Sequence, residues 1–233
     1  MTPPIATLAE TSIPSEKALS VQRRLSTHSG SGTVSSVVRQ RYMLWIDGVG
    51  AWQLCVGETF VLGAPSREHS AADIELQANL SRKHATISHS DDGWHLEAQQ
   101  ATTVADRSVT SRVAVHSGDQ ICLGDRVRLG FRVPSPLSQS AVMDFESDHR
   151  PPYSVDGIIL LVDQCLLGPR KDHHVCCSDW SDFVVLFRQG DHLMCRSRAA
   201  IEINGQALQG AGVLNHGDVV TGEELRFRIE QLL

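Results

Sequence analysis

Residues 126–133 constrain the fold most strongly, because apolar and non-apolar positions alternate along them without a break. Val127, Leu129, Phe131 and Val133 occupy every second position, and only arginine or glycine stands between them. A period of two places one set of side chains on a buried face and the other on a solvent face of a β-strand. Because almost no helical periodicity occurs elsewhere, we expect an all-β fold.

A hairpin is expected just ahead of this strand. Residues 85–88 and 94–97 flank the turn sequence Ser-Asp-Asp-Gly at residues 90–93. Short strands separated by polar turns are typical of a β-sandwich. Pro134 and Pro136 end the pattern, so we assign the first sandwich to residues 41–136.

The segments outside this sandwich divide into a tail, a linker and a repeat. Residues 1–40 are rich in Ser, Thr and Pro and cannot bury enough apolar surface to offset the entropy of ordering, so we expect a disordered tail. Residues 137–154 are poor in apolar side chains and are expected to be a linker. Residues 155–233 repeat motifs of the first unit, such as Gly-Asp at 217–218 against Gly-Asp at 118–119. We therefore expect two tandem sandwiches of related topology.

Composition excludes several classes of protein. The net charge is −6, so no broad basic surface for nucleic acid is expected. No run approaches the roughly 20 apolar residues of a membrane helix. The chain opens Met-Thr-Pro-Pro, without a basic and then apolar run, which favours a cytoplasmic protein without a membrane partner. The six cysteines include no Cys-x-x-Cys pair and are expected to be reduced.

No enzymatic motif is present. We find no glycine-rich phosphate loop, nucleophile elbow or plausibly framed pair of catalytic carboxylates, and expect neither catalysis nor a cofactor. The cluster His-His-Val-Cys-Cys at residues 173–177 contains zinc-type ligands. However, adjacent residues of a strand point to opposite faces, and no second pair lies at ligand spacing. We expect no metal site there.

The sharpest local motif precedes the strand at residue 85. Ser81, Arg82, Lys83 and His84 bring a hydroxyl, two cations and an imidazole into one loop. Such a loop can offer a hydroxyl donor, backbone N–H groups and guanidinium charge to one phosphate group, and charge-assisted hydrogen bonds are strong. A solvated turn with an incidental basic pair is the alternative, because short motifs often arise by chance.

The context of the motif resembles the forkhead-associated (FHA) family. Leu-Ser-Arg-Lys-His-Ala at residues 80–85 resembles the family signature Ser-Arg-x-His, and it follows a strand that ends at Gly63. Ser-Gly-Asp-Gln-Ile-Cys-Leu-Gly at residues 117–124 is also family-like. The resemblance implies an eleven-stranded sandwich that reads phosphothreonine through loops at one end. It also implies that Ser81, with Arg82 or Lys83, meets the phosphate and that His84 braces the loop.

Two positions depart from the family pattern. The family usually has Arg directly after the glycine of the first binding strand, whereas Ala64 and Pro65 follow Gly63 here, so Arg67 is the nearest substitute. The family also usually presents an Asn that holds the peptide backbone. Residues 103–109 contain no Asn, and Arg107 and Ser108 are the substitutes that we predict.

The second unit retains a different part of the pattern. Asn204 and Gly205 are closer to the family Asn-Gly loop than any residues of the first unit. However, Asp-Trp-Ser-Asp at residues 179–182 stands where Ser-Arg-x-His is expected, and two carboxylates oppose a phosphate dianion. We therefore interpret Asn204-Gly205 as a plain turn and expect no phosphate site in this unit.

The resemblance implies a phosphothreonine-peptide-binding adaptor in Ser/Thr kinase signalling. Its partner would be a phosphothreonine-containing protein or peptide, with a Ser/Thr kinase as a further candidate. A second hypothesis is a scaffold in which both sandwiches bind protein partners without phosphate, as some FHA-like domains do in secretion machinery. The residues alone leave both hypotheses open.

Overall fold

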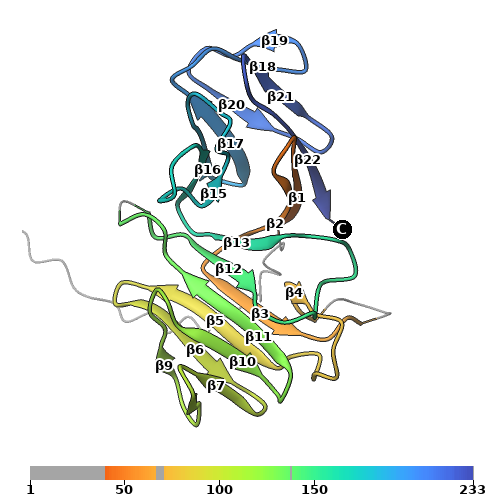
Figure 1. Ribbon diagram of the computed structural model, residues 1–233, viewed down its shortest axis with the longest axis vertical. Coiled ribbons are helices and arrows are strands. Elements are labelled where there is room, and N and C mark those ends of the chain that lie inside the picture. The colour runs from red at the N-terminus through yellow and green to blue at the C-terminus, as the bar shows by residue number, and fades with distance from the viewer. Residues whose placement is uncertain (1–39, 67–70, 137, 233) are drawn as a thin grey trace, which may run out of the picture. The chain divides into compact units, whose positions relative to one another are not determined.

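The computed structural model describes residues 40–66, 71–136 and 138–232, and every regular element in these ranges is a β-strand (Figure 1). The all-β prediction is confirmed. The expected tail lies outside the described residues, apart from Gln40. A helix long and apolar enough to cross a membrane is absent from the described ranges.

Two five-stranded sheets have equivalent strand orders. The first sheet runs β4-β3-β5-β6-β9 and the second runs β15-β14-β16-β17-β20. The strands of the first sheet are β3 (Thr59–Gly63), β4 (Ile74–Glu75), β5 (Ala85–Ser90), β6 (Gly93–Ala98) and β9 (Val113–Ala114). Those of the second sheet are β14 (Gln164–Gly168), β15 (Val175–Cys176), β16 (Val184–Gln189), β17 (His192–Ser197) and β20 (Ala211–Leu214).

The third sheet has twelve strands and serves both halves. Its order is β19-β18-β21-β22-β1-β2-β13-β12-β11-β10-β7-β8. One half comprises β7 (Thr102–Val104), β8 (Arg107–Ser108), β10 (Gln120–Leu123), β11 (Val127–Arg132), β12 (Ala141–Phe145) and β13 (Gly157–Leu161). The other half comprises β1 (Gln40–Ile46), β2 (Gly50–Val56), β18 (Ile201–Ile203), β19 (Gln206–Ala207), β21 (Val219–Gly222) and β22 (Arg226–Leu232).

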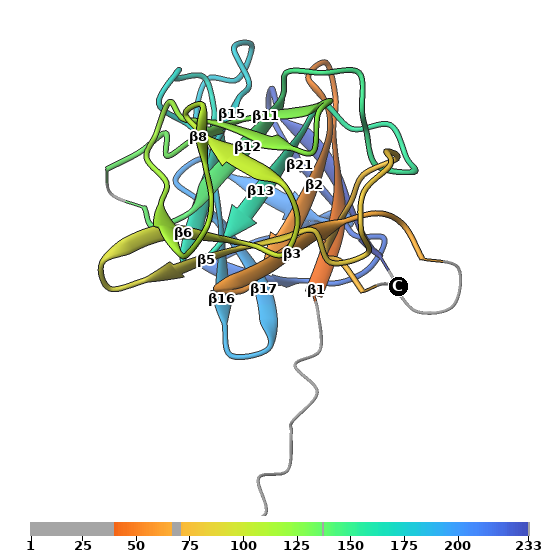
Figure 2. The same ribbon diagram turned by 90° about the horizontal axis from the view of Figure 1, so that it is seen from below.

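Each small sheet packs on one half of the large sheet, which gives two β-sandwiches. Figure 2 shows β3, β5 and β6 as one layer facing the layer that contains β11, β12 and β13. The first core contains Phe60, Ile87 and Phe131 from these two layers, whereas the second contains Leu167, Leu186 and Phe227. The expected pair of tandem sandwiches is therefore present.

The hairpins that complete the two sandwiches are exchanged. The hairpin β1–β2 precedes the first sandwich in sequence, but β1 pairs with β22, and Leu44 and Leu54 lie in the second core. The hairpin β12–β13 precedes the second sandwich, but β12 pairs with β11, and Met143 and Leu160 lie in the first core. Each sandwich is therefore completed by the hairpin that precedes the other one in the chain.

The two exchanged hairpins meet at the middle of the large sheet, where β2 and β13 pair in parallel. All five residues of β13 are buried, which fits the continuous apolar run Ile-Ile-Leu-Leu at residues 158–161. Gly157 lies opposite Trp52 in this pair, and a Cβ atom on Gly157 would lie 2.2 Å from the indole ring. Glycine is therefore required by close packing at this crossing of the two halves.

The structure differs from the expected domain division at two places. The linker expected at residues 137–154 contains β12, whose first three residues are buried, and Trp94 Nε1 donates a hydrogen bond to Gln139 O at 3.0 Å. The sandwich expected at residues 41–136 lacks its own first hairpin, because β1 pairs with β22 and most buried apolar side chains of residues 40–56 lie in the second core. The sequence does not predict β12, because its apolar run is only the three residues Ala-Val-Met in a segment that is otherwise poor in apolar side chains.

Candidate functional site

The loop between β4 and β5 holds Ser81, Arg82 and Lys83, and all three side chains are exposed. The loop backbone lies directly against the end of β3. The Ala64 N–H donates a hydrogen bond to Ser81 O at 3.0 Å, and a Cβ atom on Gly63 would lie 2.2 Å from Arg82 O. Because a side chain at residue 63 would displace the loop, only glycine allows the loop to pack this closely against the end of β3.

His84 is buried beneath this loop and connects it to a second one. Its backbone N–H donates to Leu62 O at 2.8 Å, and its carbonyl accepts from Gln99 and Gln100, which follow β6. The imidazole Nε2 lies 3.0 Å from Ala101 O. A carbonyl can only accept, so Nε2 carries the proton. The imidazole thus ties the β4–β5 loop to the β6–β7 connection.

Two further segments reach the same end of the sandwich. Gly124, in the turn between β10 and β11, donates its N–H to Ala101 O at 2.8 Å. Arg126 of this turn lines a hollow together with Asn79, Leu80 and His149. Sequence patterns give no reason to group Arg126, Asn79 and His149, which come from three separate segments, although the family-like tail ending at residue 124 points to the adjacent turn.

His149 belongs to the connection between β12 and β13, within the expected linker. This connection contacts the β4–β5 loop directly, because Gln77 N–H donates to Arg150 O at 2.8 Å. Arg150 is held by the carbonyl groups of Ser147 and His149, and its guanidinium lies 4.4 Å from the centre of the Phe145 ring. The exchanged hairpin therefore also brings a loop to the candidate site of the first sandwich.

The site carries positive charge that no ion pair between described residues neutralises. Within the described ranges, Arg82, Lys83 and Arg126 have no carboxylate within ion-pair distance, although Asp125 lines the same hollow as Arg126. Ser81, Arg82 and Lys83 line an open hollow together with Leu80. A hydroxyl, a guanidinium and an ammonium group around one hollow are suited to an oxyanion such as a phosphate group.

Two of the predicted site residues do not join this group, and a third, Arg67, lies outside the described residues. Arg107 and Ser108 form β8 and are exposed. No hydrogen bond or ion pair among the described residues links them to the β4–β5 loop at residues 76–84, which we call the Ser81 loop. The three residues of β7 separate Ala101 from the β7–β8 turn. At about 3.3 Å per strand residue, the turn lies about 10 Å from Ala101. Arg107 therefore lies at the far tip of that hairpin.

The corresponding end of the second sandwich is built differently. Leu62 pairs with Ala85 and Leu167 pairs with Val184, so Gly168 corresponds to Gly63. By the same register, residues 180–183 correspond to residues 81–84, which is one residue later than the sequence comparison placed them. Phe183 takes the position of His84, and its Cβ atom would lie 2.5 Å from a Cβ on Gly168.

Asn204 and Gly205 form the turn between β18 and β19, with φ angles of 53° and 79°. Asn204 Nδ2 donates to Asp218 Oδ1 at 2.8 Å, and Asn204 Oδ1 accepts from Val219 N–H at 3.0 Å. Left-handed conformations of this kind favour Asn and Gly. The amide of Asn204 is engaged within the protein, as the interpretation of a plain turn predicts.

All six cysteines are free thiols. Burial raises the pKa of Cys177 to about 12 and lowers that of the His174 imidazole to about 4. Cys176 is exposed, whereas His173 is buried. In the described part of the chain, no three His, Cys, Asp or Glu side chains are grouped closely enough to hold a metal ion.

Comparison with known proteins identifies the first sandwich. The family model of the FHA domain matches residues 61–124, which include Gly63, the Ser81 loop and His84 and end at Gly124, before Arg126. Residues 61–124 therefore match an FHA domain, and FHA domains are, as a family, protein-interaction modules that bind phosphopeptides. No curated protein matches the chain. Among solved structures, the N-terminal FHA domain of EssC, a component of the bacterial Type VII secretion apparatus, shares 12% identity over 82% of this chain and 94% of that chain. Its TM-score is 0.23, too low to support a structural argument.

Proposed function

We propose that this protein binds phosphothreonine-containing proteins through the Ser81 loop and serves as an adaptor in Ser/Thr kinase signalling. One observation carries the proposal. The β4–β5 loop exposes Ser81, Arg82 and Lys83 to solvent. Its backbone packs closely against Gly63, and the hydrogen bond of the buried His84 to Ala101 O holds it in place. A loop that is fixed before binding loses little conformational entropy when it binds an anion.

Each exposed side chain has a distinct role in this proposal. The Ser81 hydroxyl donates a hydrogen bond to a phosphate oxygen, and Arg82 and Lys83 supply charge. Arg126 of the β10–β11 turn is a further candidate cation, because it lines a hollow together with Leu80, which precedes Ser81. Arg67 remains a second candidate for that arginine. Arg107 and Ser108 remain candidates only for contacts with peptide residues distant from the phosphate.

The test begins with a degenerate phosphothreonine peptide library, from which one binding peptide is chosen for calorimetric titration. Loss of one charge-assisted hydrogen bond costs about 1.5–3 kcal/mol, or roughly ten- to a hundredfold in affinity. We expect Ser81→Ala and Arg82→Ala each to weaken binding by that factor. Arg112→Ala is the matched control, because Arg112 is exposed at the β5–β6 end and hydrogen-bonds Ser90. Equal weakening by all three variants would contradict the proposed site.

A phosphate-independent scaffold is the second candidate. It is favoured by Ala64 in the place of the family arginine and by the distance of Arg107 from the Ser81 loop. In that case, selected peptides would bind without regard to their phosphate group. Ser81→Ala would then leave the affinity unchanged.

A further inference from the structure

The corresponding loop ends of the two sandwiches differ in charge. In the first sandwich, Lys83 lies in the β4–β5 loop and Arg126 in the β10–β11 turn. The pairing registers place Asp182 at the position of Lys83. They also place Glu223 and Glu224 in the turn between β21 and β22, which corresponds to the turn at Arg126. Asp182 thus replaces Lys83, and a turn that holds Asp125 and Arg126 in the first sandwich holds two carboxylates and no cation in the second.

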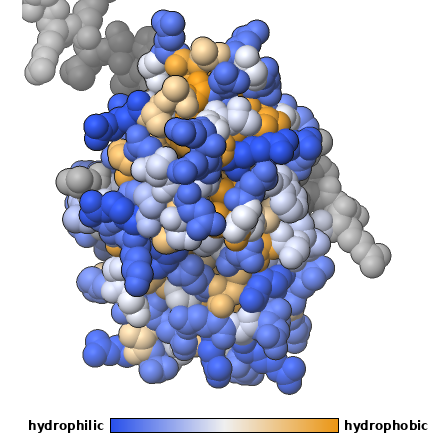
Figure 3. Space-filling view, turned by 45° about the horizontal axis from the view of Figure 1, so that its top comes forward, coloured by the Kyte–Doolittle hydropathy of each residue, from blue (hydrophilic) through white to orange (hydrophobic). Residues whose placement is uncertain are grey.

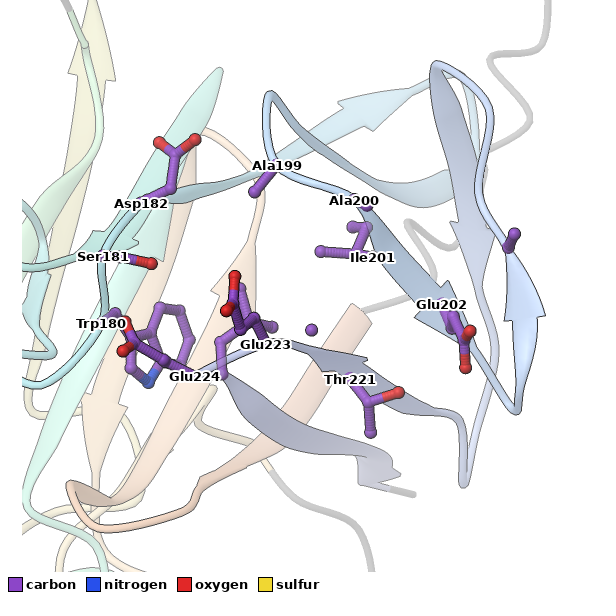
Figure 4. Close-up of a pocket in the computed structure, with 13 residues that line it drawn as sticks. Trp180, Ser181, Asp182, Ala199, Ala200, Ile201, Glu202, Thr221, Glu223 and Glu224 are labelled. Carbon is purple, nitrogen blue, oxygen red and sulfur yellow. The ribbon is translucent and has the colours of Figure 1, made fainter.

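These carboxylates surround a pocket of about 390 Å³, shown in Figure 4. Its lining comes from the β15–β16 loop, the β17–β18 connection and the β21–β22 turn, which correspond to the three segments of the site in the first sandwich. Trp180, Ile201 and Leu225 are buried and form its apolar part. In the close-up, the Glu223 carboxylate lies between Ser181 and Ile201.

The negative charge of the pocket is not neutralised within the described structure. None of the carboxylates of Asp182, Glu223 and Glu224 forms an ion pair with a described residue, and the protein contact of Asp182 is with the N–H of Phe183. Arg198 directly precedes Ala199 of the β17–β18 connection, but it is not among the residues that line the pocket. The face seen in Figure 3 is largely hydrophilic, with only separate apolar areas.

We infer that this pocket binds the arginine or lysine side chain of a peptide segment in a protein partner. The apolar wall formed by Trp180 and Ile201 accommodates the aliphatic stem of such a side chain, and the carboxylates bind its cationic head. The same charges repel a phosphate dianion, so the ligand differs in sign from the one proposed for the first sandwich. The inference does not depend on phosphothreonine binding by the Ser81 loop.

The test uses the full chain labelled with ¹⁵N and two capped pentapeptides. One has a central arginine, and the other has citrulline, which keeps the shape of arginine but lacks its charge. We expect the arginine peptide to cause saturable shifts of the amide signals of Ser181, Ala199 and Gly222, and to bind at least tenfold more tightly than the citrulline peptide. Added salt should weaken the arginine complex.

Paired variants separate the pocket from general acidity. The double variant Glu223→Gln and Glu224→Gln should weaken the arginine peptide at least tenfold, whereas Glu97→Gln, an exposed position on β6, should not change its affinity. Both variants should bind a phosphothreonine peptide like the parent chain. Equal affinity for the citrulline peptide, shifts scattered over other acidic surfaces, or an unchanged affinity of the double variant would overturn the inference.

Discussion

The substitution Met143→Ala tests the exchanged hairpins, because residue 143 lies in the segment that sequence patterns assign to a linker. The side chain of Met143 is fully buried in the core of the first sandwich. Replacement of a buried Met by Ala typically costs about 2–5 kcal/mol, whereas substitution in an exposed linker changes stability by about 0.5 kcal/mol or less. We therefore expect a clear decrease in the urea midpoint.

Hydrogen exchange locates the damage. In Met143→Ala, we expect amide protection to fall chiefly in β5 and β6 of the first sandwich. In Leu44→Ala, where the lost side chain belongs to the second core although it precedes the first sandwich in sequence, protection should fall chiefly in β16 and β17. The reverse pattern, with Leu44→Ala opening β5 and β6, would refute the exchange.

The two sandwiches can also unfold as a single cooperative unit, in which case both variants lower protection everywhere. Proton–proton nuclear Overhauser effects then decide. The exchange predicts cross-strand contacts between the Hα protons of β1 and β22, which pair Leu44 with Ile229. Contacts between β1 and β11 in their place would refute it.

The remaining predictions concern packing, the loop brace and pH. Gly157→Ala should lower stability by roughly 1–3 kcal/mol, because its new Cβ collides with the Trp52 ring; an unchanged melting temperature would contradict this close packing. His84→Ala should lower the melting temperature and weaken peptide binding together, whereas Lys83→Ala should affect binding alone; a fully stable His84→Ala variant would show that the brace is dispensable. Burial lowers the pKa of His174 to about 4, below the ordinary 6.5 that it has when unfolded. The unfolded chain therefore takes up the proton first, and stability should fall by about 3 kcal/mol in total as the pH drops from about 7 to 4. If the urea midpoint of the His174→Asn variant fell as steeply between pH 7 and 5 as that of the parent chain, His174 would not be the group responsible.

Local patterns were sufficient to predict the strands that bury one face. The alternation at residues 126–133 appears as β11, and the turn at residues 90–93 joins β5 to β6 as expected. These elements are set by side-chain periodicity and turn residues, which are properties of short stretches. The loop motif around Ser81 was likewise visible, because its residues are contiguous.

The partnership of the hairpins was not predictable from such patterns. Both hairpins, β1–β2 and β12–β13, consist of short apolar strands. Neither hairpin has a sequence feature that determines which of the two sandwiches it pairs with. The exchange becomes apparent only from the pairing of β1 with β22 and of β12 with β11. Arg126 and His149 were missed for a related reason, since they reach the Ser81 loop from distant parts of the chain.

The most direct test of the proposed function compares one peptide with and without its phosphate group. The full chain is titrated calorimetrically with a library-selected phosphothreonine peptide and with the same peptide carrying unmodified threonine. Phosphate contacts from Ser81 and Arg82 predict at least a tenfold preference for the phosphorylated form. Equal affinities for the two forms would contradict phosphothreonine recognition and leave the phosphate-independent scaffold in its place.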